Sequence, residues 1–213
     1  MVNLKKLIIA CDGESASGKS TAAKLISKKY KLLLINSGLI YRYCSKLIIH
    51  HKPKNIIDFL EKKLKKVSYK EISKQKLHTE EISNHVAVLS TNKKVRNIVN
   101  KLQMKIIRNN NRICVEGRDI ASKILARNPK YDVAFYFKCN LEIAAYRRWL
   151  DNKKLVKFKE VKKSLKKRTN LDKKRKNSPL IKVDDAILIR SDKLNKIQVL
   201  KRMSKEIDKV FKN

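Results

Sequence analysis

The chain has 213 residues, 42% of them hydrophobic and 34% charged, and its 54 lysines and arginines against 19 acids give a formal net charge of +35. This length suits one α/β domain, or one such domain carrying a small insert. No apolar run approaches the length of a membrane-spanning helix, so no membrane partner is expected. With 4 glycines and 3 prolines, long disordered linkers are not expected either.

Five short apolar runs predict buried strands, and helical spacing between them predicts helices. The strands are expected at Leu4–Ala10, Leu32–Ile35, Arg112–Val115, Val133–Phe137 and Ile187–Ile189. Helices are expected at about 18–30, 37–50, 55–66, from 79 onward, 92–108, 140–149, 157–174 and 194–211, while the polar stretch 67–77 predicts a small hairpin. This alternation indicates a parallel sheet covered on both faces, with an insert at roughly 52–91 between the second and third strands.

The eight residues from 13 to 20 match the pattern G-x-x-x-x-G-K-[ST], with a predicted strand before them and a helix after them. Small side chains let successive backbone N–H groups converge on a phosphate, and the start of the helix adds its positive end. Lys19 is predicted to reach the β- and γ-phosphates, and the Ser20 hydroxyl to ligate Mg²⁺. The predicted ATP phosphate site comprises Gly13, Glu14, Ser15, Ala16, Ser17, Gly18, Lys19, Ser20 and Thr21. Glu14 is unusual beside a phosphate, and its side chain is expected to point to solvent.

Two further segments lie at the carboxyl ends of predicted strands, where doubly wound sheets present their ligands. Arg42 follows the second strand, and Arg118 with Asp119 follows the third. Each arginine offers a planar fork suited to an anionic phosphate, and Asp119 can accept from a base amino group or hold the arginine. Taken singly, an Arg–Asp neighbour is better explained as a surface ion pair.

The four cysteines lie far apart without CxxC spacing, and three of them fall in or beside apolar runs. They are interpreted as small buried hydrophobes of a reducing, cytoplasmic environment: Cys11, Cys44, Cys114 and Cys139. The four histidines show no ligand spacing, so no metal cage built from the protein alone is expected.

The lysines are spread along the whole chain, with 6% aromatic residues and no aromatic-interleaved basic patch. Such a field attracts polyanions and speeds encounters with nucleotides. We interpret the charge as compositional and expect no dedicated nucleic-acid partner.

Six short motifs in one order along the chain resemble the bacterial cytidylate kinases, which belong to the P-loop nucleoside monophosphate kinases. They are the phosphate loop at 13–20, S-G-x-x-Y-R at 37–42, L-H-T-E-E-I at 77–82, V-R at 95–96, G-R-D-I at 117–120 and R-x-x-x-D-x-x-R at 168–175. The resemblance implies a three-layer α/β P-loop kinase fold with a five-stranded parallel sheet, in a single domain over residues 1–213. It further implies a monophosphate-binding insert at about 52–91, a helical lid at about 155–178 and a monomer.

The same resemblance implies ATP-dependent phosphorylation of CMP or dCMP with Mg²⁺. It gives catalytic roles to Lys19, Arg118, Arg168 and Arg175, and CMP contacts to Ser37, Tyr41, Arg42, Arg96, Arg118, Asp119, Arg168, Asp172 and Arg175. Of these, Arg96 and Asp119 would face the cytosine, and Asp172 would accept from the sugar hydroxyls. Spacing alone puts residues 168, 172 and 175 on one helix face.

The sequence departs from the family pattern at three informative positions. Glu14 stands where proline is usual, Asn36 where aspartate is usual, and Ala87 where a serine helps to read cytosine. The last change leaves the preference between CMP, dCMP and UMP open, because an unpaired buried polar group is what enforces such discrimination. Two alternatives remain: a P-loop kinase with another acceptor, such as UMP, AMP or a non-nucleotide metabolite, and a basic nucleic-acid-associated NTPase.

Overall fold

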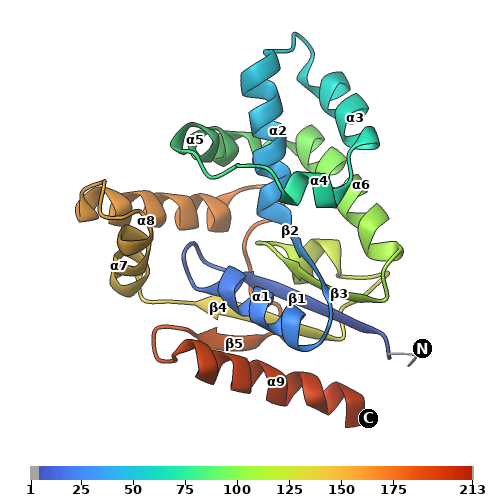
Figure 1. The fold of residues 1–213 in the computed structure, drawn as a ribbon, viewed down its shortest axis with the longest axis vertical. Helices are drawn as coiled ribbons and strands as arrows, with labels where there is room; N and C mark the ends of the chain where they lie inside the picture. The colour runs from blue at the N-terminus through green and yellow to red at the C-terminus, as the bar shows by residue number, and fades with distance from the viewer. Residues whose placement is uncertain (1–4, 213) are drawn as a thin grey trace. The chain divides into compact units, whose positions relative to one another are not determined.

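The computed structural model describes residues 5–212, which form two compact units (Figure 1). The first unit runs up to Leu34 and resumes from Asn111, and the second comprises Ile35–Asn110. None of the helices in the described part of the chain combines the length and apolar character needed to cross a bilayer.

A five-stranded sheet of order β2-β3-β1-β4-β5 organises the fold. Its strands are β1 (Leu7–Gly13), β2 (Leu33–Asn36), β3 (Arg112–Glu116), β4 (Val133–Lys138) and β5 (Ile187–Arg190). The pairs β1-β3, β1-β4 and β4-β5 are parallel, and all seven residues of the central β1 are buried. The predicted five-stranded α/β fold is thus confirmed. β1 begins later and ends later than predicted, and Leu4 lies outside the described residues.

Two helices of the first unit pack on the sheet, and two others pack on each other. α1 (Lys19–Lys29) and α9 (Lys196–Lys212) share one core with the strands, which includes Ile9, Ala23, Ile26, Phe135, Phe137, Met203 and Ile207. α7 (Leu141–Asp151) and α8 (Phe158–Lys174) enclose a smaller core of Cys139, Ala144, Ala145, Val161 and Leu165, and Ala16 packs against this smaller core. All four cysteines are buried, as predicted.

The second unit is helical from Ser37 onward. It contains α2 (Ser37–His51), α3 (Ile56–Lys66), α4 (Tyr69–Ser73), α5 (Glu80–Leu89) and α6 (Lys93–Arg108). Each helix begins after a residue whose side-chain oxygen accepts a first-turn N–H, namely Asn36, Asn55, Ser68, Thr79 and Asn92. The predicted hairpin at 67–77 is wrong, because Ser68 and Glu71 form a reciprocal capping box that starts α4.

A short π-helix, η1 (Ile120–Ile124), follows β3 and was not predicted. It matters for the site because it continues the segment that carries Arg118 and Asp119. The expected insert at 52–91 falls within the second unit, and the expected lid at 155–178 contains α8. Both assignments stay predictions about function.

Candidate active site

The phosphate loop joins β1 to α1 and has a backbone that only certain residues can adopt. Gly13 has φ +152°, and a Cβ there would lie 2.3 Å from the Phe137 carbonyl oxygen, so a side chain cannot fit. Ala16 and Gly18 also have positive φ, 55° and 73°. Gly18 is the N-cap of α1 and gives it no side-chain cap, so the first-turn N–H groups face the loop. This geometry suits a phosphate at the positive end of the helix.

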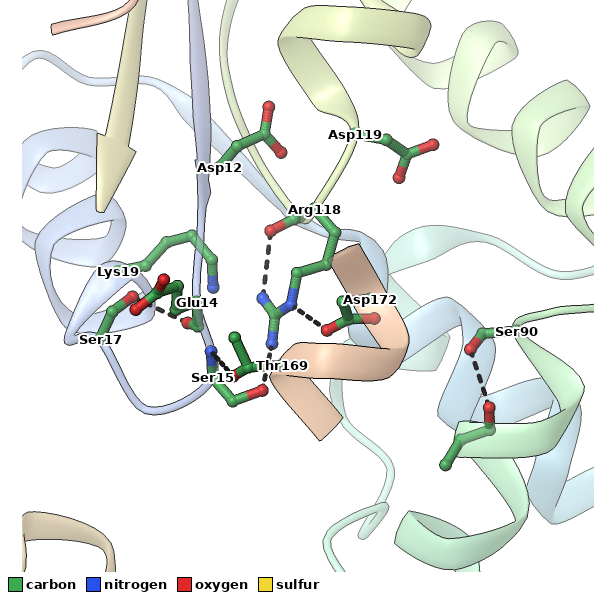
Figure 2. Close-up of polar contacts among 12 residues, drawn as sticks. Asp12, Glu14, Ser15, Ser17, Lys19, Ser90, Arg118, Asp119, Thr169 and Asp172 are labelled. Carbon is green, nitrogen blue, oxygen red and sulfur yellow. Dashed lines mark hydrogen bonds and ion pairs between the residues drawn. The ribbon is translucent and has the colours of Figure 1, made fainter. Parts of the chain in front are cut away.

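Contacts within the loop and with β4 fix its shape. The Glu14 N–H donates to the Phe137 carbonyl at 3.0 Å, and the Ser17 hydroxyl donates to the Glu14 carbonyl at 2.9 Å. Ser15, whose N–H lies 3.4 Å from the Thr169 hydroxyl of α8, is buried. The loop is therefore held in place by the sheet on one side and touched by α8 on another (Figure 2).

The buried carboxylate of Glu116, at the end of β3, contacts the two side chains that are predicted to bind ATP and Mg²⁺. Lys19 Nζ lies 3.2 Å from Glu116 Oε1, and the Ser20 hydroxyl donates to the same oxygen at 2.8 Å. The pKa of Lys19 is lowered by burial and by the nearby Arg118. The other carboxylate oxygen of Glu116 is buried and has no hydrogen-bond partner among residues 5–212. Sequence reasoning missed Glu116, although an acid closing a buried strand was a visible signal.

Asp12 is a second buried acid that sequence reasoning missed. Its carboxylate accepts the N–H groups of Ile120 at 2.9 Å and Ala121 at 2.8 Å, and the side chain is 3% exposed. Burial raises its pKa to about 6, against the lowering effect of these two hydrogen bonds. Asp12 thus ties β1 to the segment that carries Arg118 and Asp119. Its signal in the sequence was an acid inside an otherwise apolar strand.

Arginines and aspartates from two segments, 118–119 and 172–175, meet beside the loop. Arg118 Nε lies 2.8 Å from Asp172 Oδ2, and its Nη2 lies 3.4 Å from the Ser15 hydroxyl (Figure 2). Arg175 lies 3.4 Å from both Asp172 and Asp119. Burial alone would lower the pKa of Arg118, but the facing Asp172 carboxylate outweighs it and the pKa is raised. The structure therefore brings together Arg118, Asp119, Asp172 and Arg175.

Two predictions about this region need correction. The prediction that Arg168, Asp172 and Arg175 share one helix face is wrong for Arg175, because α8 ends at Lys174 and Arg175 is extended with ψ 137°. Its guanidinium nevertheless reaches Asp172. Glu14 does not point to solvent: its side chain is 12% exposed, and its carboxylate lies 2.6 Å from Lys173 Nζ of α8. The reason is a basic partner 159 residues away, which no local pattern shows.

Thr21 lies in α1 and Arg168 in α8, and the other predicted residues belong to the second unit. The Ser37 hydroxyl donates to Gln103, and Arg42 donates to the Leu77 carbonyl at 3.0 Å and the Ser83 hydroxyl at 2.9 Å. These contacts tie α2 to α6 and α5.

Arg96 and Tyr41 lie together in this unit, and both are buried. Arg96 donates to the Ser90 carbonyl at 3.1 Å, and its guanidinium carbon lies 5.6 Å from the centre of the Tyr41 ring. At position 87, where the family has serine, the Ala87 carbonyl accepts a hydrogen bond from the Ser90 hydroxyl at 3.5 Å.

The parallel sheet, the glycine-bounded loop after β1 and the lysine that opens α1 define a P-loop kinase. A model of the cytidylate kinase family matches residues 9–209. The chain belongs to the cytidylate kinase family.

Individual relatives agree with this assignment. The chain is 36% identical to a cytidylate kinase of Mycoplasma capricolum, over 92% of this chain and 94% of that protein. It is 33% identical to one of Fusobacterium nucleatum, over 97% of this chain and all of that protein. A solved structure of an uncharacterized protein from Eubacterium ventriosum has a TM-score of 0.54 at 17% identity, over 96% of this chain and 99% of that one, which is a likeness of fold alone.

Proposed function

We propose that this chain transfers the γ-phosphoryl group of ATP to CMP or dCMP, forming ADP and CDP or dCDP. One observation carries the proposal: in a member of the cytidylate kinase family, Arg118 and Arg175 gather beside a phosphate loop that presents Lys19. The transferred phosphoryl group spreads negative charge over its oxygens, and fixed cations stabilise that charge without any covalent enzyme intermediate.

In this proposal the loop residues 13–21 hold the phosphates of ATP. The Lys19 ammonium stays in contact with the γ-phosphoryl group while it is transferred. Glu116 holds the Lys19 ammonium in place until the triphosphate takes over as its anionic partner. Arg118, Arg175 and Arg168 complete the cations of the transfer step. Arg118 and Arg175 already share Asp172 as a partner, which supports their acting on one group of phosphate oxygens.

The roles proposed for acceptor binding follow the family resemblance, residue by residue. Ser37, Tyr41 and Arg42 would hold its phosphate, and Arg96 and Asp119 would face the cytosine. Asp172, with Arg168 one helical turn before it, would accept from the sugar hydroxyls. The bonds of Arg42 to a carbonyl and a hydroxyl support this role, since they orient its guanidinium.

Mg²⁺ is proposed to bind beside Ser20, with the carboxylate of Glu116 close by. Hydroxyl and carboxylate oxygens are the hard donors this ion prefers, and the buried, unpartnered oxygen of Glu116 fits a cation nearby. When bound, the ion would neutralise charge on the phosphates. Residues 155–178 are proposed as a lid that excludes water, and residues 52–91 as the monophosphate-binding insert. The single domain, the monomeric state and the cytoplasmic location stay predictions.

An acceptor panel tests the proposal. The protein is incubated with ATP and Mg²⁺ and, separately, with CMP, dCMP, UMP, AMP, GMP or no acceptor, while ADP formation is followed. We expect CMP and dCMP to give the fastest reaction, with UMP as the informative competitor because of Ala87. Faster ADP formation with any other nucleotide would reassign the acceptor. ADP formation that no acceptor stimulates would remove the kinase assignment.

A further inference from the structure

The phosphate loop carries its own acid, Glu14, on a rigid piece of backbone. Its N–H and its carbonyl are both hydrogen bonded, to Phe137 and Ser17, so the residue cannot easily turn away. Its side chain is 12% exposed. A carboxylate held this close to a phosphate cradle repels any triphosphate that enters. The proposed function alone does not explain why the loop tolerates it.

The partner of this acid comes from α8. Lys173 Nζ lies 2.6 Å from Glu14 Oε1, and the lysine side chain is 44% exposed. In the neighbouring ion pair the acid lies on α8 and the base beside the loop, because Asp172 of α8 binds Arg118 at 2.8 Å. α8 is therefore joined to the loop region by two ion pairs, in which each side contributes one acid and one base.

We infer that Lys173 is a positioning residue for ATP, which neutralises Glu14 and so shields the triphosphate from the loop's own negative charge. The inference rests on the proposed function in one respect, that a triphosphate occupies the loop. Lys173 is not required to touch the nucleotide. Its effect passes through Glu14, so the two residues are expected to behave unequally when each is changed alone.

The two single variants should differ in ATP binding because each leaves a different charge at the loop. Lys173→Met leaves an unpaired carboxylate at the loop, which repels the triphosphate and weakens ATP binding. Glu14→Gln breaks the same ion pair but keeps the loop backbone, removes the repelling charge and leaves Lys173 near the anion, so ATP binding is tighter. If the pair served only to dock α8 onto the loop, both changes would weaken binding alike.

The test measures the dissociation constant of ATP by titration calorimetry, with Mg²⁺ and without any acceptor. The variants are Lys173→Met, Glu14→Gln and their double variant. Lys174→Met is the matched control, because Lys174 is the next residue of α8, is also exposed, and its loss changes the net charge equally. Thermal unfolding checks that each variant is folded.

We expect Lys173→Met to raise the dissociation constant about fivefold above that of Lys174→Met, and the double variant to return close to Glu14→Gln. The excess should shrink as ionic strength rises, because exposed charges are screened. Equal values for Lys173→Met and Lys174→Met would overturn the inference, as would unchanged or weaker ATP binding by Glu14→Gln.

Because no acceptor is present, this outcome is separate from that of the proposed function. A wild type that binds ATP but ignores CMP would contradict the proposed acceptor and leave the role of Lys173 standing. A wild type that phosphorylates CMP, with both single variants weakened alike, would contradict the role of Lys173 alone.

Discussion

The contacts described for the cations beside the phosphate loop include carboxylates, and those described for Arg42 and Arg96 of the second unit include carbonyl and hydroxyl oxygens. Near the loop, Lys19 faces Glu116, and Arg118 and Arg175 face Asp172. In the second unit, Arg42 donates to a carbonyl and a hydroxyl, and Arg96 donates to a carbonyl. Carboxylates neutralise a cation, whereas carbonyl and hydroxyl oxygens orient it.

The difference indicates two ways of preparing a site for an anion. A cation held by a carboxylate can exchange that partner for a phosphate, so ligand binding replaces one anion by another. A cation held by carbonyls and hydroxyls is fixed in direction beforehand and needs no exchange through these contacts. Substitutions near the loop should therefore act by changing the charge that meets the phosphate. Substitutions in the second unit should act by changing the orientation of the arginines.

The largest effect is expected at Lys19. Lys19→Ala removes the ammonium proposed to stabilise the transferred phosphoryl group, so kcat should fall about a thousandfold or more. Lys24→Ala, on the exposed side of the same helix, should retain near wild-type kcat. Steady-state rates of ADP formation with CMP measure both. A Lys19→Ala variant with more than a tenth of the wild-type kcat would show that the loop does not act as proposed.

A smaller effect is expected at Asp12, which acts through backbone N–H groups. In Asp12→Asn the amide can present only one acceptor to the N–H groups of Ile120 and Ala121, so the Arg118 segment loosens and kcat should fall about tenfold. Asp132→Asn serves as the control, because Asp132 is another acid that accepts a backbone N–H, that of Ile8. A kcat equal to the control would show that this anchor does not position Arg118.

The same variant carries a prediction about pH. The pKa of Asp12 is raised from 3.8 to about 6 in the folded chain, so the folded state binds the proton more tightly than the unfolded state. The free energy of unfolding should therefore fall as pH rises from about 4 to about 6, by roughly 3 kcal/mol from this group, and level off above. Urea unfolding should show this fall in the wild type relative to Asp12→Asn. Parallel curves for the two proteins would contradict it.

The smallest effect is expected in the second unit. Ser83→Ala removes a hydroxyl that accepts a hydrogen bond from Arg42, without changing charge, so the KM for CMP should rise about two- to threefold while kcat changes little. Ser73→Ala, which removes an exposed hydroxyl elsewhere in this unit, is the control. A large drop in kcat with unchanged KM would contradict the distinction between orientation and charge.

The elements that sequence predicted well are those specified by neighbours along the chain. The five strands follow from apolar runs, and the loop follows from its glycines and small residues between a strand and a helix. α4 was missed although Ser68 and Glu71 spelled out its start, because the polar composition of 67–77 favoured a hairpin.

The parts of the site that sequence could not supply are set by distant partners. Glu116 meets Lys19 across 97 positions, Asp12 meets Ile120 across 108, and Glu14 meets Lys173 across 159. Each acid is conspicuous in its own segment, but its partner appears only when the fold brings the distant segments together. The family resemblance supplied Asp119 and Arg175 as site residues, but not the ion pair that joins them.

The fate of the γ-phosphorus atom distinguishes phosphoryl transfer to CMP from hydrolysis of ATP. ATP labelled at its γ-phosphorus is mixed with Mg²⁺, CMP and the protein, and the labelled products are separated. We expect the label to appear in the β-position of CDP, in step with ADP, and Lys19→Ala to abolish this transfer. Label released as inorganic phosphate, with CMP left unchanged, would contradict direct transfer between the two nucleotides.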